Sequence, residues 1–172
     1  MGRGVTFRCD HSKVPHDHDN TLELGRMVDE GRIDDVLALV SPQDIAEAWS
    51  CFHERQRSNG WAAAADPDWW AVDFWVTSFH SSNAESVVRQ GLLALVDTVP
   101  EELLAYVGAG PLMNFVGPDE DRIAWIESVA AKSSRFRAAL TAVAVWHEEG
   151  WVVERLERAA GAPLYRPAPT DK

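Results

Sequence analysis

Apolar residues recur at helical spacing through most of this 172-residue chain, and that period limits the fold more than any other feature. A helix buries one face when apolar side chains stand at offsets of 0, 3, 4 and 7, whereas a half-buried strand alternates every second residue. The helical pattern runs from Leu24 to Ala159. The sequence therefore predicts an all-α protein. The clearest stripes are Ile33, Val36, Leu37 and Val40; Ile45, Ala48, Trp49 and Phe52; and Val88, Leu92, Leu95 and Val99.

Start and stop signals divide these stripes into about eight helices. Ser41-Pro42, Asp66-Pro67-Asp68 and Gly117-Pro118 each place a cap or a turn and a proline where a helix begins. The helix after Ser41 is expected to turn Arg55 toward solvent. The glycines of Gly108-Ala-Gly110-Pro111 predict the end of a short helix that opens at Pro100.

Two further helices have less regular stripes. The helix after Asp68 is expected to bury the stripe Trp69, Val72, Val76 and Phe79, with Trp70, Phe74 and Trp75 widening its apolar arc. A later helix, capped by Ser133 or Ser134, is expected to continue until Gly150 breaks it. Its stripe is Phe136, Leu140, Val143 and His147.

The predicted helices fit a single domain at residues 21–161, because 172 residues is within the usual size of ~100 to 200 residues for one domain. Short loops make neighbouring helices antiparallel, so we expect stacked antiparallel helical hairpins, as a compact multi-helix bundle or a short α-solenoid. Residues 1–20 and 162–172 are expected to be irregular. No apolar run approaches the ~20 residues that cross a bilayer, and no secretory signal is visible, so we expect no membrane partner and a cytoplasmic location.

The charge balance favours a basic protein partner over nucleic acid. Lysine and arginine number 16 against 27 aspartates and glutamates, a formal net charge of −11. Such a field repels polyanions but speeds association with a cationic partner. The acidic excess is greatest between Asp66 and Glu127, where the only basic residues are Arg89 and Arg122. An acidic surface can also serve solubility alone, and that alternative stays open.

Two predicted loops hold candidate partner-binding carboxylates, and we expect the two loops to lie together. Trp61, in a glycine- and alanine-rich loop, is the candidate aromatic anchor, because tryptophan is enriched among the residues that dominate binding at interfaces. The six carboxylates are those of Asp97, Glu101, Glu102, Asp119, Glu120 and Asp121.

A cluster of cysteine and histidine near the N-terminus is the candidate metal site. Four such ligands complete the tetrahedron that structural zinc prefers, and they leave no position for a catalytic water. The alternative is a polar tail with adventitious metal affinity. No other cofactor is indicated. The four candidate ligands are Cys9, His11, His16 and His18.

No catalytic signature is present, so we expect that the protein is not an enzyme. The chain lacks a nucleophile elbow, a phosphate-binding loop and an HExxH helix. Its paired carboxylates fit first turns of helices or exposed positions. A nucleophilic Cys9 or Cys51 would need the fold to place a histidine beside it.

Three segments resemble a family of uncharacterised bacterial all-α domains of unknown function. They are Asp68-Trp-Trp-Ala-Val-Asp-Phe-Trp75, Leu104-Ala-Tyr-Val-Gly-Ala-Gly-Pro-Leu112, and Arg135-Phe-Arg-Ala-Ala-Leu140 followed by Trp146. The similarity covers residues 66–147. It implies a helical fold, and no activity or catalytic residue. In type, small acidic bacterial proteins of this kind also resemble immunity proteins that neutralise toxins.

Together these features predict an acidic domain that binds a basic protein, as an immunity-type inhibitor neutralises a cationic toxin or enzyme. The expected mechanism is electrostatic steering followed by burial of an aromatic anchor. Two alternatives stay open. One is a helical protein linked by zinc or binding a small molecule, and the other is a structural or oligomerising scaffold. The partner and the oligomeric state cannot be read from the sequence.

Overall fold

The computed structural model describes residues 18–59, 66–78, 85–146 and 149–166, and these residues form an all-α fold. If the continuous run from Glu101 to Phe115 is counted as one helix, the described residues form nine helical segments, close to the predicted eight. The predicted fold class is confirmed. The elements are α1 (His18–Asp29), α2 (Ile33–Leu39), α3 (Pro42–Asn59), α4 (Trp69–Thr77), α5 (Glu85–Thr98), the 3₁₀ turn η3 (Glu101–Leu103), α6 (Leu104–Val107), the π-helical turn η4 (Gly108–Leu112), α7 (Met113–Phe115), α8 (Glu120–Ala130), α9 (Ser134–Leu140) and α10 (Gly150–Ala160).

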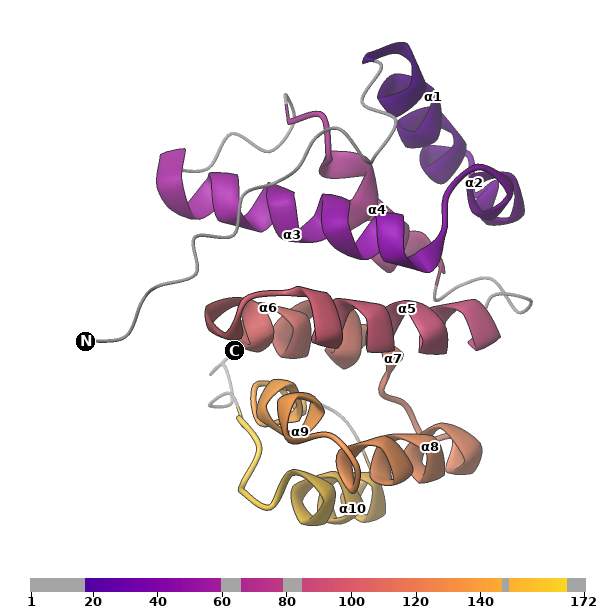
Figure 1. Cartoon of the computed structure of the whole chain (residues 1–172). Coiled ribbons are helices and arrows are strands. Elements are labelled where there is room, and N and C mark those ends of the chain that lie inside the picture. Colours follow the sequence, from indigo (N-terminus) through magenta and orange to yellow (C-terminus); the bar gives the residue numbers. More distant parts are fainter. Residues whose placement is uncertain (1–17, 60–65, 79–84, 147–148, 167–172) are drawn as a thin grey trace, which may run out of the picture.

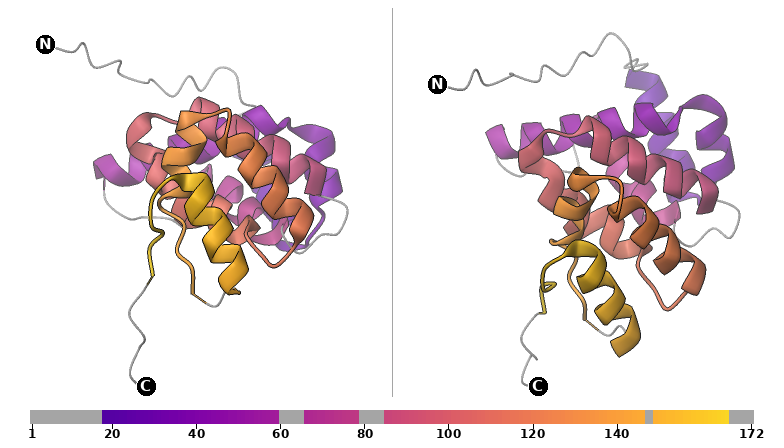
Figure 2. Two further views of the ribbon diagram at one scale, coloured as in Figure 1. Left: turned by 90° about the horizontal axis from the view of Figure 1, so that it is seen from below. Right: turned by 60° about the horizontal axis from the view of Figure 1, so that its bottom comes forward.

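The helices lie in three layers that follow the order of the chain (Figure 1). α1 to α4 form the first layer, α5 and the Glu101–Phe115 helix the second, and α8 to α10 the third. The right-hand view of Figure 2 shows the same succession. α3 packs on α5 and α6 packs on α9, so the middle layer contacts both others. None of the described helices is both long and apolar enough to cross a membrane.

Local signals set most helix boundaries. The Ser41 hydroxyl accepts a hydrogen bond from the Asp44 amide (3.2 Å), and the Asp44 carboxylate accepts one from the Ser41 amide (2.8 Å). Asp119 and Ser133 cap α8 and α9 in the same way. Such caps satisfy backbone donors that the first turn leaves unpaired. The first boundary differs from the prediction, because α1 begins at His18, inside the segment expected to be irregular.

The helix that follows Pro100 was predicted to end at the glycines. It continues instead through the π-helical turn η4 to Phe115. Gly108 has a helical φ of −63°. Its role is close packing, because a Cβ there would lie 2.0 Å from the carbonyl oxygen of Ala139 on α9. Among the described residues, the glycines with positive φ are Gly31 and Gly161.

The buried face of α4 also differs from the prediction. Val76 is 53% exposed, and Trp69 and Val72 are only half-buried, while Phe79 lies outside the described residues. Almost every residue of α4 is apolar, so its period does not select a face, and packing against α1 and α3 decides instead. The residues that are buried are Trp70, Ala71, Phe74 and Trp75.

The predicted helix up to Gly150 is wrong as well, because α9 ends at Leu140. After a turn, the chain is extended, and Ala144 forms a parallel β-bridge with Tyr165. The amide of Val145 donates to the Tyr165 carbonyl at 3.0 Å, a bond that a continued helix would not allow. Leu164 is buried, so the chain after α10 packs on the domain at this point.

Candidate functional site

An aromatic pocket lies between α3, α4 and the Glu101–Phe115 helix. Its volume is about 210 Å³. α3 contributes an indole and an imidazole, α4 contributes a second indole with two valines, and the third helix contributes a phenol and the π-helical turn. The walls are therefore mostly apolar and aromatic, with few polar groups. The lining residues are Trp49, His53, Val72, Trp75, Val76, Tyr106, Ala109, Gly110, Pro111 and Asn114.

The π-helical turn η4 forms one wall of this pocket. π-Helical turns are rare in proteins, and those that occur are often found at functional sites. Gly108 holds the turn against α9, as its close approach to Ala139 shows. Gly110 faces open space, since a Cβ there would meet no atom within 4 Å. The turn is thus fixed on one side and leaves room on the other.

His53 lies among aromatic rings at the edge of the pocket. Its ring centroid is 4.0 Å from that of Trp49, 5.0 Å from that of Phe52 and 5.4 Å from that of Tyr106. Burial lowers the pKa of His53 to about 4. The imidazole is therefore neutral at pH 7, with one nitrogen able to donate and the other able to accept a hydrogen bond. It adds polarity to the wall without adding charge.

The size of the pocket limits what it can hold. An apolar cavity of about 150 Å³ holds one benzene molecule, and sites for drug-sized ligands occupy about 300 to 1,000 Å³. A volume of about 210 Å³ lies between the two. The pocket accommodates one ring or one amino-acid side chain.

A carboxylate lies one helical turn from the pocket rim. α3 and the Glu101–Phe115 helix run antiparallel, because His53 contacts Tyr106 and, one turn along, Arg57 lies 3.7 Å from Glu102. Tyr106 is 45% exposed at the rim, and both members of the Arg57–Glu102 pair are exposed. Glu102 therefore places a carboxylate near the rim, and Arg57 is its partner.

Two packing contacts hold the tryptophans of the wall in place. A Cβ at Gly91 of α5 would lie 2.6 Å from Cη2 of Trp75, so the Trp75 ring packs directly on the α5 backbone. Arg55, which was predicted to point toward solvent, instead pairs with Asp66 at 2.5 Å and with the fully buried Asp68 at 2.6 Å. This pairing ties the start of α4 to α3, the two helices that supply Trp75 and Trp49.

The ion pair also shifts a carboxyl pKa. Burial alone would raise the pKa of Asp66, but hydrogen bonds from the Arg55 guanidinium and the Asp68 amide outweigh that effect and lower it. The charged form of Asp66 is therefore the one that the fold stabilises.

The two predicted acidic loops do not lie together. The guanidinium of Arg122 lies 3.4 Å from Glu85, so the start of α8 is beside the start of α5. Asp97 follows Glu85 by 12 residues on α5, and at 1.5 Å per residue this places the two about 18 Å apart. Asp97 and the carboxylates at 119–121 therefore lie near opposite ends of α5.

All six predicted carboxylates are exposed, but several have structural partners. Asp119 caps α8, Glu120 pairs with Arg155 at 2.7 Å, and Glu102 pairs with Arg57. Asp97, Glu101 and Asp121 are exposed on their helices. Of the six predicted carboxylates, Glu102 is the one that a contact places near the pocket rim, through Arg57.

Several predicted site residues lie outside the described part of the chain. These are Trp61 and the candidate zinc ligands Cys9, His11 and His16. His18 begins α1, but its side chain is not described, so the zinc site stays a prediction. Within the described ranges, no group of three or more histidine, cysteine, aspartate or glutamate side chains is placed to hold a metal ion.

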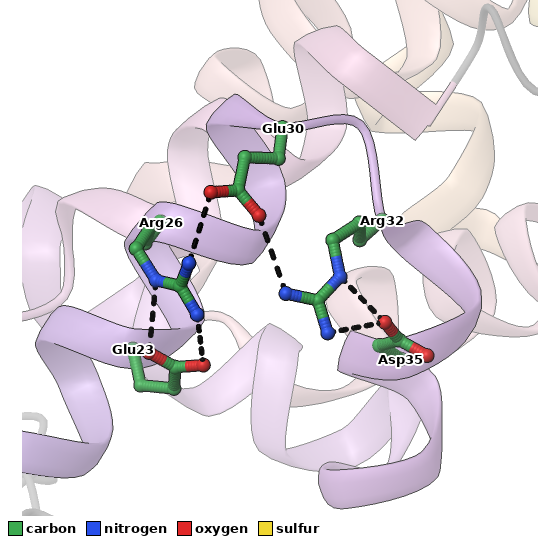
Figure 3. A network of polar contacts seen from close by, with 5 residues as sticks. All are labelled: Glu23, Arg26, Glu30, Arg32 and Asp35. Carbon is green, nitrogen blue, oxygen red and sulfur yellow. Dashed lines mark hydrogen bonds and ion pairs between the residues drawn. The ribbon is translucent and has the colours of Figure 1, made fainter.

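Arginines on the first layer are paired rather than grouped into a basic patch. Arg26 lies between Glu23 and Glu30, and Arg32 lies between Glu30 and Asp35 (Figure 3). These pairs are exposed, and solvent screening makes such pairs worth little stability. The carboxylates of these pairs neutralise Arg26 and Arg32, so this part of the first layer is not a basic surface.

Sequence reasoning missed the pocket itself. The helical pattern predicts Trp75 in the apolar arc of its helix, and it gives neither His53 nor Tyr106 a place in a pocket. The available signal was the spacing of four residues between Trp49 and His53, which puts both on one face of α3. The other walls come from residues 20 to 60 positions later in the chain, which no local pattern connects to α3.

Comparison of the chain with known protein families, with curated proteins and with solved structures found no match. The resemblance to uncharacterised bacterial domains therefore stays a prediction, and the function must be argued from the pocket and its surroundings.

Proposed function

We propose that this protein binds a basic partner protein and takes one of its side chains into the aromatic pocket. The observation that carries the proposal is the pocket of about 210 Å³, walled by Trp49, Trp75 and Tyr106, near the exposed carboxylate of Glu102. The expected consequence is inhibition of a cationic enzyme or toxin whose active site the bound protein covers.

Two physical arguments support this function. Interfaces depend on a few side chains that fill well-packed pockets, and the pocket volume suits one such side chain. Complementary charge raises the association rate of the two proteins, and the net charge of −11 favours a cationic partner. The carboxylate of Glu102, near the pocket rim, would attract the cationic partner at the shortest distance.

A pocket-blocking variant tests the proposal. Gly110→Leu should fill the pocket without disturbing the core, because a Cβ at Gly110 meets no atom within 4 Å. Gly117→Leu is the matched control, since Gly117 is equally open and does not line the pocket. Each full-length chain is used to capture proteins from the native host extract at low salt. The wild type and the Gly117→Leu control should retain the same basic protein, and Gly110→Leu should lose it. Equal capture by all three chains would contradict the proposal.

Charge variants test the steering step on the captured pair. Neutralising Asp97, Glu101 and Glu102 together should slow association and flatten its dependence on salt. The control neutralises three exposed carboxylates elsewhere and changes the net charge equally. Its association rate should stay closer to that of the wild type. The control residues are Asp34, Asp121 and Glu154.

A further inference from the structure

The pocket walls have a chemistry that favours positive charge. Aromatic rings carry negative potential on their faces and attract ammonium or guanidinium groups within about 6 Å of the ring centroid. Three of the lining residues, Trp49, Trp75 and Tyr106, have such rings. None of the lining residues is a lysine or an arginine. A cation entering the pocket would therefore meet no like charge on its walls.

Tyr106 is the ring that is open to a ligand, because it is 45% exposed, whereas Trp49 and Trp75 are each 2% exposed. We infer that the side chain bound in the pocket is cationic, a lysine or arginine of the partner whose charged group lies against the ring of Tyr106, near the carboxylate of Glu102. This inference rests on the proposed function and names the class of side chain that the same site would take. The competing occupant is a neutral apolar side chain of similar size.

The charges around the rim agree with a cationic occupant. Glu102 lies one turn from Tyr106, and Arg57 is the cation that pairs with it. The Arg57–Glu102 distance of 3.7 Å is long for an ion pair, and both side chains are exposed. Glu102 can therefore exchange Arg57 for an incoming cation at little cost.

His53 does not oppose this occupant. Its ring lies against Trp49 and Tyr106, and burial lowers its pKa, so it is neutral at pH 7. A neutral imidazole can accept a hydrogen bond from an ammonium or guanidinium group. A protonated one would repel it.

The protein uses the same interaction inside its own fold. The guanidinium carbon of Arg89 lies 5.5 Å from the ring centroid of Trp125, and that of Arg122 lies 5.2 Å from the Phe115 centroid. In a third pair, the guanidinium carbon of Arg155 lies 5.9 Å from the ring centroid of Trp151. These pairs show that arginine and aromatic rings pack together in this structure at distances that the pocket could reproduce with a partner's side chain.

A pair of probes with the same shape and different charge tests the inference. Choline and 3,3-dimethylbutan-1-ol differ by a quaternary nitrogen in place of a quaternary carbon. Each is titrated into the full-length protein at low salt, and binding is followed by the shift of the probe's methyl proton resonances, which aromatic ring currents displace. We expect choline to bind at least about fivefold more tightly than the alcohol. Gly110→Leu should abolish choline binding, and Gly117→Leu should leave it unchanged.

Two substitutions at the rim should move choline affinity in opposite directions. Glu102→Gln should weaken choline binding about twofold to fivefold, and Arg57→Gln should strengthen it by a similar factor. Asp121→Asn, an equal charge change on α8, should have a smaller effect. The affinity of the neutral alcohol should change little in all three variants.

Three outcomes would overturn the inference: equal affinity for the two probes, no binding of either, or choline binding that survives Gly110→Leu. None of these would decide whether the partner uses the pocket, because capture by wild type, Gly110→Leu and Gly117→Leu tests that separately. Conversely, partner capture that survives Gly110→Leu would refute the proposed function even if choline bound in the pocket.

Discussion

Substitution of Gly108 by alanine should destabilise the fold, whereas the same change two residues later should not. A Cβ at Gly108 would lie 2.0 Å from the carbonyl oxygen of Ala139 and 2.9 Å from Cβ of Ala142. A relaxed carbon–oxygen contact needs about 3.3 Å, so α9 would have to move away by more than 1 Å. A Cβ at Gly110 meets no atom within 4 Å.

The expected free energies follow from these contacts. Overpacking a well-packed interior costs about 1 to 3 kcal/mol, and a clash with backbone belongs at the upper end. Alanine regains up to about 1 kcal/mol over glycine inside a helix. Gly108→Ala should therefore lower the free energy of unfolding by about 2 kcal/mol, and Gly110→Ala should leave it unchanged or raise it by up to about 1 kcal/mol.

Urea denaturation followed by far-ultraviolet circular dichroism measures both variants against the wild type. With an m-value of about 1 to 3 kcal/mol/M, the unfolding midpoint of Gly108→Ala should fall by roughly 0.7 to 2 M. If Gly108→Ala and Gly110→Ala agreed within about 0.5 kcal/mol, the close packing of η4 on α9 would be refuted. A loss in both variants would instead favour the left-handed glycine stop that the sequence pattern predicts.

Three other variants test the surroundings of the pocket. Asp68→Ala removes the buried partner of Arg55 and should lower the free energy of unfolding by about 2 to 4 kcal/mol, measured by urea denaturation. The exposed control Asp121→Ala should change that free energy by less than about 0.5 kcal/mol. Gly91→Ala pushes the Trp75 ring away from α5 and should cost about 1 to 3 kcal/mol, with an altered near-ultraviolet circular dichroism spectrum; an unchanged spectrum and stability would refute that contact. His53→Phe should reduce the acid sensitivity of the fold. The native pKa of His53 is about 4, below the usual 6.5, so the unfolded state binds more protons between these pH values and wild-type stability falls as the pH drops from about 6.5 to about 4. Equal losses in wild type and variant, measured by urea denaturation at pH 7, 5 and 4, would contradict the burial of His53.

Local signals predicted the helices well because the physics that they report is local. Ser41 and Ser133 accept hydrogen bonds from the first turns that follow them, as their sequence context predicts. The helix after Gly117-Pro118 also forms, with Asp119 as its cap. The stripe from Ile45 to Phe52 is buried because its offsets place it on one face of α3. These features depend on residues within a few positions of one another.

The features that sequence reasoning missed depend on distant residues. The glycines after Val107 look like a helix end, but Gly108 is small because Ala139 of another helix approaches it. Asp97 and Asp119 were expected in neighbouring loops. They lie near opposite ends of α5, because Arg122, at the start of α8, pairs with Glu85 at the start of α5. The pocket needs three helices at once, so no single stripe could indicate it.

The central claim is that the partner contacts the pocket, and site-specific photo-crosslinking tests it most directly. Val76 lines the pocket and is 53% exposed, so a photoreactive p-benzoylphenylalanine there would reach a bound side chain. Leu39, 61% exposed on α2, is the control, because His53 lies about 17 Å further along α3 from its start at Pro42. After irradiation in the native host extract, the account predicts a covalent adduct from position 76, none from position 39, and loss of the adduct in the Gly110→Leu background. An adduct from position 39 alone, or one from position 76 that survives Gly110→Leu, would contradict it.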